Sequence, residues 1–182
     1  MPTFFERVTG RNVTSPDDPN LFTNCIFCGI SVEKDFRIVA ENERFVVIKD
    51  KYPSATIHLL VIPRRHIPNT NNLTQDDVEL VRSMHSFGRE ALDSVRTSEG
   101  KDERNHKTPD YLFGFHIPPF RSVDHLHLHC FQLPFLSKRQ GLKYPVSEPS
   151  GSAKFKGTGW FVTAEQVIGI LNSGQKIGFK SC

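Results

Sequence analysis

The sequence predicts an α+β domain in which an antiparallel sheet of about five strands carries a long helix on one face and a second helix near the C-terminal end. Three observations predict this class. Short β-branched, apolar runs lie on both sides of one long segment with helical spacing, and a shorter helical segment comes last. The 182 residues, of which 37% are hydrophobic, suit one compact domain.

The folded part is expected to start near Cys25, after an N-terminal arm. Residues 1–23 contain "TSPDDPN" and no hydrophobic periodicity, so we expect a flexible arm there. The runs "FRIVAENERFVVIKD" and "ATIHLLVIP" then predict a three-stranded meander, the first run being broken at the turn-like residues 41–43.

Thr74 marks the start of the long helix. Asp77 lies at the third helical position of a capping box, and Leu73 and Val78 can form a hydrophobic staple across it. Apolar residues continue at helical spacing as far as Val95. The charged stretch that follows, "RTSEGKDERNHKTPD", predicts a solvated loop.

Two more strands and a last helix follow this loop. "YLFGFH" and "SVDHLHLHCFQL" predict antiparallel strands with "IPPFR" as a constrained loop between them, which places the main domain at residues 24–136. Residues 137–159 are rich in Gly, Pro, Ser and Lys and predict an irregular insertion. Residues 160–182 predict a C-terminal helix and tail, with a capping box at Thr163 and Gln166.

Three histidines alternate with leucines in the second of these strands. In an extended strand successive side chains point to opposite faces, so His125, His127 and His129 share one face. Leu126 and Leu128 then occupy the buried face. Such a row fits a metal site, a nucleophilic imidazole with helpers, or a polar face that is merely rich in histidine.

A nucleophilic imidazole explains the row best. A neutral ring can attack phosphorus when an acceptor holds its other nitrogen, because the lone pair is then fixed on the attacking atom. Neighbouring histidines can supply protons and donate to phosphoryl oxygens, so no metal is needed in the reacting shell. A catalytic zinc on all three histidines is the weaker hypothesis, since same-face neighbours on one strand usually give two ligands.

Cys25 and Cys28 form a C-x-x-C pair near the start of the domain. Four cysteines are too few for a disulfide framework, and the pair fits a redox site, two structural thiols or half of a tetrahedral zinc site. A thioredoxin-like site lacks support, because no βαβ pattern surrounds the pair.

The bulk composition excludes several classes of function. The net charge of +3, without a Lys/Arg block, is too weak to argue for a nucleic-acid surface, although it is compatible with an anionic small ligand. No apolar stretch reaches membrane-spanning length, and Glu6 and Arg7 interrupt any signal-peptide pattern. We therefore expect a soluble intracellular protein, in the cytoplasm and additionally in the nucleus, with no membrane partner.

The motif "HLHLH", preceded by Ser122 and accompanied upstream by "HLLVIPRRH", resembles the histidine-triad (HIT) superfamily, and within it the Hint branch. "GFHIPPF", "FLSK" and "WFVTA" are most similar to the third, vertebrate-type subgroup of that branch. The resemblance covers residues 25–135, with a weaker echo at 160–170. It implies the HIT fold and a homodimeric nucleoside phosphoramidase that cleaves the P–N bond of AMP-amine or AMP-lysine conjugates, and it extends to aminoacyl adenylates.

The resemblance implies a role for each residue of the triad and its neighbours. The nucleophile is His127, which attacks the α-phosphorus and becomes nucleotidylated, and His129 contacts the phosphate. His58 orients the others, and the alternative interpretation of this residue is a satisfied core histidine. Ser122 donates to the phosphate or the leaving nitrogen; without the resemblance it is a loop serine.

The resemblance also implies a nucleotide site. Asp50 accepts from the ribose hydroxyls, an assignment that depends on the family because an acid at a strand end is commonly just solvated. Ile48 and Val123 line the pocket for a purine base. His116 is also assigned to the nucleotide site. It departs from the usual Hint pattern, which has an asparagine there, and this leaves the leaving-group preference open.

A structural zinc is the one cofactor implied. Many HIT relatives complete a zinc site with the histidine after "VIPRR", here His66, and the first triad histidine, here His125. Together with Cys25 and Cys28 these give a Cys2His2 set. No catalytic metal is expected.

Two other functions compete with phosphoramidate hydrolysis. Aprataxin-type DNA deadenylases share the departure at His116, but the zinc finger that normally follows their HIT domain needs ligands, and only Cys182 follows the triad region here. The third hypothesis is a noncatalytic module that binds nucleotides or a protein and keeps the triad only as a binding surface.

Overall fold

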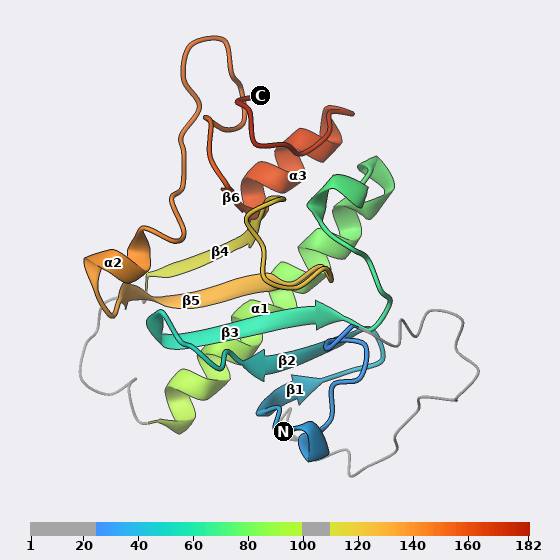
Figure 1. Cartoon of the computed structure of the whole chain (residues 1–182), viewed down its shortest axis with the longest axis vertical. Helices are drawn as coiled ribbons and strands as arrows, with labels where there is room; N and C mark the ends of the chain where they lie inside the picture. The colour runs from blue at the N-terminus through green and yellow to red at the C-terminus, as the bar shows by residue number, and fades with distance from the viewer. Residues whose placement is uncertain (1–24, 100–109) are drawn as a thin grey trace, which may run out of the picture.

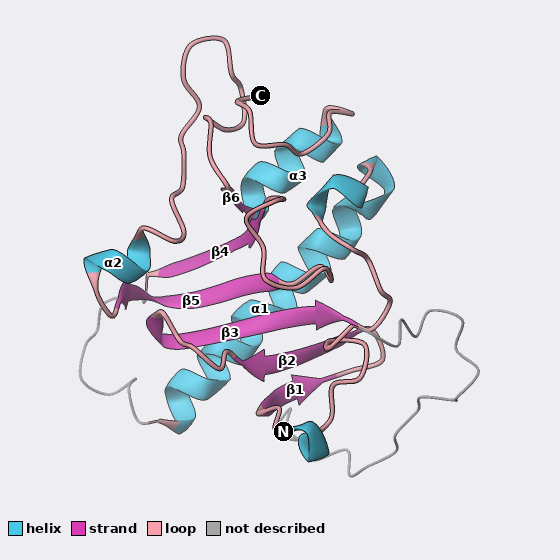
Figure 2. Cartoon of the chain, in the orientation of Figure 1, coloured by secondary structure: helices cyan, strands magenta, loops and turns pink. Residues whose placement is uncertain are grey.

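The computed structural model describes residues 25–99 and 110–182, and these form one six-stranded antiparallel sheet with the two longer helices on one side (Figures 1 and 2). The order across the sheet is β1-β2-β3-β5-β4-β6. The strands are β1 (Ile38–Glu41), β2 (Phe45–Lys49), β3 (Ala55–Pro63), β4 (Tyr111–His116), β5 (Leu128–Phe135) and β6 (Phe161–Thr163). The α-helices are α1 (Val78–Ser98), α2 (Lys138–Gly141) and α3 (Ala164–Asn172), and 3-10 turns lie at Val32–Lys34, Thr70–Asn72 and Gln75–Asp77.

The main hydrophobic core lies between the sheet and α1. Figure 1 shows α1 running behind the strands, and α1 packs on β3, β5 and α3. Val81, Met84 and Leu92 are fully buried on the inner side of this helix, as the helical spacing in the sequence predicts. Among the described residues, no long helix lies over the opposite face of the central strands (Figure 1). This open face carries the triad histidines, because Leu126 and Leu128 between them belong to the core under α1.

The predicted elements are confirmed in most places. The three-stranded meander forms β1, β2 and β3, and β4 pairs antiparallel with β5. The backbone NH of Thr74 donates to the Asp77 carboxylate in the predicted capping box, although a 3-10 turn precedes α1. The box of Thr163 and Gln166 starts α3 as predicted, and Gly174 follows its end with a φ of 73°.

The sheet has six strands rather than about five. The additional strand, β6, has three residues, so it gives no periodic signal in the sequence, and it forms because it pairs with β4. Gly114 makes this pairing possible, since a Cβ there would lie 2.5 Å from the Phe161 ring. β5 also starts later than predicted, at Leu128.

The segment 137–159 contains more structure than its composition suggests. Residues 138–141 form α2, the side chain of Tyr144 is buried, and that of Lys156 is fully buried. The ammonium group of Lys156 lies within hydrogen-bond distance of four backbone carbonyls, those of residues 157, 178, 179 and 180, which share its three N–H donors. The proposed domain boundaries remain predictions.

Part of the predicted organisation lies outside the described residues. This applies to the N-terminal arm at 1–23 and to most of the charged loop after α1, of which residues 100–109 are not described. Within the described part of the chain, no helix is both long and apolar enough to cross a membrane.

Candidate active site and metal-binding cluster

A groove of about 1090 Å³ lies on the open face of the sheet, and it brings together most of the predicted nucleotide-binding residues. Asp50 follows β2 directly, and His58 lies on the neighbouring strand β3. Ser122 and Val123 reach the groove from the loop before β5. The residues of the predicted set that line it are Ile48, Asp50, His58, Ser122 and Val123.

The triad histidines share one face, as the alternation predicts. Leu126 and Leu128 belong to the core under α1, whereas His127 and His129 lie on the opposite side, with their ring centroids 5.0 Å apart. His129 is in β5, and His127 immediately precedes that strand.

His127 is held in the tautomer that a nucleophile needs. Its Nδ1–H donates to the backbone carbonyl of His125 at 2.6 Å, so the lone pair lies on Nε2. Only 8% of the residue is exposed, and burial lowers its pKa to about 4. The edge of Phe27 packs against the ring, with centroids 5.4 Å apart. At neutral pH the ring is therefore uncharged and ordered by its neighbours.

Three further imidazoles form a hydrogen-bonded chain beside His127. Nε2 of His58 and Nδ1 of His129 are 2.9 Å apart, and Nε2 of His129 and Nδ1 of His116 are 3.2 Å apart. The chain ends on backbone groups: the NH of Ser54 faces Nδ1 of His58 at 3.3 Å, and Nε2 of His116 faces the carbonyl of Lys143 at 3.0 Å. We call these three residues the imidazole chain.

The imidazole chain is uncharged at neutral pH. Burial is the main cause that lowers the pKa of His58, to about 3, and that of His129 well below its ordinary value. The pKa of His116 is also lowered by burial. The Asp50 carboxylate lies 3.5 Å from Nε2 of His58, and desolvation raises the pKa of Asp50.

Several residues that complete the site were missed by the sequence analysis. Tyr144 packs against all three rings of the imidazole chain, and its hydroxyl lies 3.3 Å from the Ser54 hydroxyl. The indole NH of Trp160 donates to the same Lys143 carbonyl that accepts from His116. Phe27, between the two cysteines, covers His127. The one signal in the sequence for Tyr144 and Phe27 is an aromatic residue within the otherwise polar stretch "GLKYP" and within the C-x-x-C loop "CIFC".

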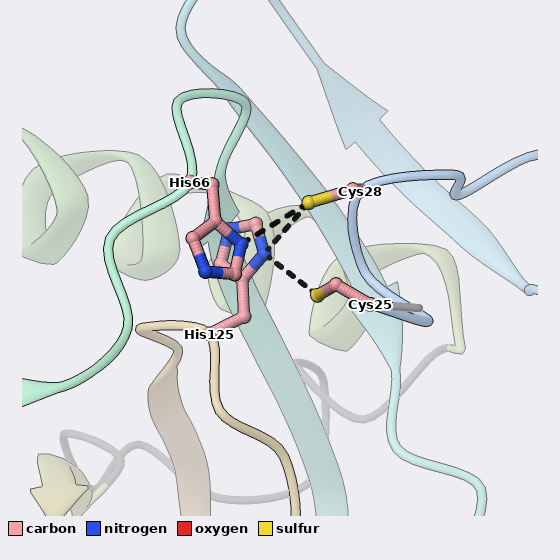
Figure 3. A group of neighbouring side chains, drawn as sticks. All are labelled: Cys25, Cys28, His66 and His125. Carbon is pink, nitrogen blue, oxygen red and sulfur yellow. Dashed lines mark hydrogen bonds between the residues drawn. The ribbon is translucent and has the colours of Figure 1, made fainter. Parts of the chain in front are cut away.

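The predicted Cys2His2 set comes together as a compact cluster (Figure 3). Nδ1 of His125 lies 3.3 Å from Sγ of Cys25 and 3.6 Å from Sγ of Cys28, and Nδ1 of His66 lies 3.2 Å from Sγ of Cys28. Nε2–H of His125 donates to the Pro63 carbonyl at 2.8 Å, which leaves Nδ1 deprotonated on the side of the sulfurs. Burial lowers the pKa of His125 to about 4, which favours the neutral ring that a metal needs.

These distances fit a small tetrahedral ion. Zinc bonds of about 2.3 Å to sulfur and 2.0 to 2.1 Å to nitrogen place neighbouring tetrahedral ligand atoms roughly 3.3 to 3.8 Å apart. All four ligand atoms of the cluster lie within 4.8 Å of one another. The donor set and these three nitrogen–sulfur distances therefore suit zinc.

A second group, Asp50, His58 and His129, also gathers potential ligand atoms within 4.8 Å. Its tautomers oppose metal binding. Because Nδ1 of His58 accepts from the Ser54 NH, the ring proton is on Nε2, which is the nitrogen that a metal would occupy. The absence of a catalytic metal remains a prediction, and this arrangement supports it.

Comparisons with known proteins agree with the geometry. The family described as "Scavenger mRNA decapping enzyme C-term binding" matches residues 24–144. A bifunctional adenosine 5'-phosphosulfate phosphorylase/adenylylsulfatase, HINT4, from Arabidopsis thaliana is 39% identical over 79% of this chain and 88% of its own length. An adenosine 5'-monophosphoramidase, HINT3, from Danio rerio is 36% identical over 87% of this chain and 88% of its own. Aprataxin from Ciona intestinalis is 33% identical over 81% of this chain but only 34% of its own length.

An antiparallel sheet with a buried histidine triad beside a groove defines an enzyme of the nucleotide-hydrolase class. The chain belongs to the histidine-triad family and groups with the Hint branch of its hydrolases.

Proposed function

We propose that the protein hydrolyses adenosine 5'-monophosphoramidates through a covalent nucleotidyl intermediate on His127. The observation that carries this proposal is the hydrogen bond from Nδ1–H of His127 to the His125 carbonyl, which directs a neutral, lone-pair-bearing Nε2 away from the backbone. The substrate class is taken from relatives whose names specify adenosine 5'-monophosphoramidase activity.

The reaction has two displacement steps. In the first, the Nε2 lone pair of His127 forms a bond to the α-phosphorus while the P–N bond to the amine breaks. The amine leaves with that electron pair and takes up a proton, for which the Ser122 hydroxyl is our candidate donor. In the second, the oxygen of a water molecule bonds to the same phosphorus while the bond between phosphorus and Nε2 breaks and its electron pair returns to His127. One proton of that water passes to the Ser122 oxygen, which restores the hydroxyl, and AMP leaves.

The groove supports the positions proposed for the nucleotide. Asp50 lines the groove, and its carboxylate is our candidate acceptor for the ribose hydroxyls. Ile48 and Val123 belong to an apolar cluster that suits a purine base. His129 lies next to His127 and is our candidate for contact with the phosphate. Both of its ring nitrogens face other imidazoles in this structure, so we propose that Nε2–H turns from His116 to the phosphate when the nucleotide binds. Aminoacyl adenylates are a further substrate class at the same phosphorus.

We also propose that Cys25, Cys28, His66 and His125 hold a structural zinc ion. The ion ties the C-x-x-C loop to the first triad histidine, so its removal displaces Phe27 from the face of His127. We further propose that the protein forms a homodimer and is located in the cytoplasm and the nucleus. Sedimentation analysis and imaging of a tagged chain test these two points.

Mass spectrometry of an acid-free quenched reaction with an AMP-lysine conjugate tests the nucleophile. The wild type should carry an added nucleoside monophosphate, and H127A should carry none. H85A is the matched control, because His85 lies on α1 beside Glu165, away from the groove, and should keep the adduct. An adduct that persists on H127A contradicts the assignment.

The aprataxin-type alternative is tested by comparing substrates. Turnover of an adenylated nicked DNA duplex should be much slower than turnover of the AMP-lysine conjugate under matched conditions. Faster turnover of the duplex would favour DNA deadenylation. Tight AMP binding with no turnover of any of these compounds would favour a noncatalytic module.

A further inference from the structure

We propose that His116 is a positioning residue, which fixes His129 in one tautomer and one orientation by linking it to the backbone carbonyl of Lys143. The catalytic consequence rests on the proposed function, because it concerns the imidazole beside the nucleophile. The structural part rests only on hydrogen bonds and packing among described residues.

Only one arrangement of ring protons satisfies both ends of the imidazole chain. An amide NH can only donate, so Nδ1 of His58 accepts from Ser54 and the His58 proton is on Nε2. This proton is donated to Nδ1 of His129, whose own proton is then on Nε2. Nε2–H of His129 donates to Nδ1 of His116, and Nε2–H of His116 donates to the Lys143 carbonyl, which can only accept.

The imidazole chain therefore fixes the tautomer of each of its three rings and does not relay protons. Neither end is titratable, so a proton that entered the chain would leave two N–H groups facing each other. Moving the protons along it without adding one would place an N–H against the amide of Ser54 and a bare nitrogen against the carbonyl of Lys143. Each ring is thus held neutral in a single tautomer.

Hydrogen bonds and ring packing hold the end of the imidazole chain at His116 and the Lys143 carbonyl in place. The Lys143 carbonyl also accepts from the indole NH of Trp160, so two donors from different elements hold it. The ring of His116 lies between Tyr144 and Phe161, with centroids 5.1 and 5.4 Å away. Lys143 lies two residues after the end of α2, so the segment 137–159 contributes a wall of the site.

Histidine suits position 116 because its two nitrogens lie at different distances from Cα. An asparagine carries its polar atoms about as far out as Nδ1, so it can reach His129 but not the Lys143 carbonyl. H116N therefore separates the two links, whereas H116A removes both. H85N is the matched control for the histidine-to-asparagine change, since His85 pairs with Glu165 on the helix side of the sheet.

The experiment combines kinetics with nitrogen-15 NMR of the imidazole rings in the full-length chain. In the wild type, His58, His129 and His116 should each carry the proton on Nε2, with slow exchange at His129. H116A should lose this protection and lower kcat for an AMP-lysine conjugate about 10- to 100-fold, with KM changed less than threefold. H116N should lie between H116A and the wild type, and H85N should match the wild type.

The outcomes separate this proposal from the proposed function. Unchanged kcat and unchanged His129 signals in H116A and H116N would overturn it, as would a wild-type His129 protonated on Nδ1. Thermal unfolding of each variant shows whether the fold is kept, and H116N gives the answer if H116A does not fold. If the wild type turns over no phosphoramidate but shows the expected ring protons, the proposed function fails. The proposal that His116 fixes the tautomer of His129 then still stands.

Discussion

Two neighbouring regions of this protein use histidines from the same row in opposite ways. In the Cys2His2 cluster, Nε2–H of His125 is bound to the Pro63 carbonyl and Nδ1 faces two sulfurs. In the imidazole chain, both nitrogens of His129 face other imidazoles. His127 lies between them with Nδ1–H on a carbonyl and Nε2 directed elsewhere.

The comparison shows that the partner of one ring nitrogen decides what the other can do. Alternation along an extended segment places the three rings on one face, but it does not distinguish them. Backbone carbonyls and amides make the distinction, because they can neither exchange roles nor titrate. In our proposals, one pattern thus yields a metal ligand, a nucleophile and a positioned neighbour.

The largest expected effect on kcat comes from substitution of His127, the middle histidine of the three. H127N should lower kcat for AMP-amine conjugates by at least about 1000-fold, because the attacking nitrogen is lost while a similar volume is kept. Steady-state kinetics with H85N as control measure this. A loss below tenfold would place the nucleophile on another residue.

Removal of the metal should have the second largest effect. C25S should lose bound zinc and lower Tm by roughly 5 to 10 °C, because the loop that packs on His125 and His127 is no longer tied down. Elemental analysis and calorimetry measure the two quantities. C182S is the matched control, since Cys182 lies outside the cluster, and it should bind metal as the wild type does. Equal metal content in both variants would contradict the assignment.

Acid should weaken the imidazole chain in a defined pH window. The pKa of His58 in the folded protein is lowered to about 3, mainly by burial, whereas an unfolded chain has an ordinary value of about 6.5. The unfolded state therefore binds the proton more readily. The stability contributed by the neutral ring is complete above about pH 6.5 and is lost as the pH falls toward 3.

Urea unfolding at several pH values measures this dependence. Between about pH 6 and 4, the free energy of unfolding of H58N should fall less steeply than that of the wild type, by up to about 1.4 kcal/mol per pH unit. The difference between the two slopes cancels the pH dependence of the zinc ligands. Identical slopes would show that His58 is not held neutral in the folded state.

The sequence predicts the helices and the meander because their signals are local. The capping boxes at Thr74 and Thr163 and the periodic apolar residues of α1 depend on neighbours within a few positions. β6 is missed because three residues carry no period, and its pairing with β4 depends on the path of the whole chain.

The site was predictable as a set of residues but not as a network. The triad and the Cys2His2 set follow from spacing and resemblance, and the structure brings the metal set together. The predicted interpretation of His116 as a nucleotide-binding residue stays untested, but both of its nitrogens are occupied in this structure. The Lys143 carbonyl and the Tyr144 ring lie far along the chain from their partners, and no local pattern marks a backbone acceptor.

The smallest expected effect comes from Trp160, which shares the Lys143 carbonyl with His116. W160F keeps an aromatic ring beside Phe120 but removes the indole NH, so one of the two donors to that carbonyl is lost. The expected cost is about 0.5 to 1.5 kcal/mol in the free energy of unfolding and a two- to fivefold fall in kcat. Urea unfolding and steady-state kinetics measure both. A fall in kcat as large as that of H116A would mean that the indole, and not the imidazole, holds the outer end of the chain.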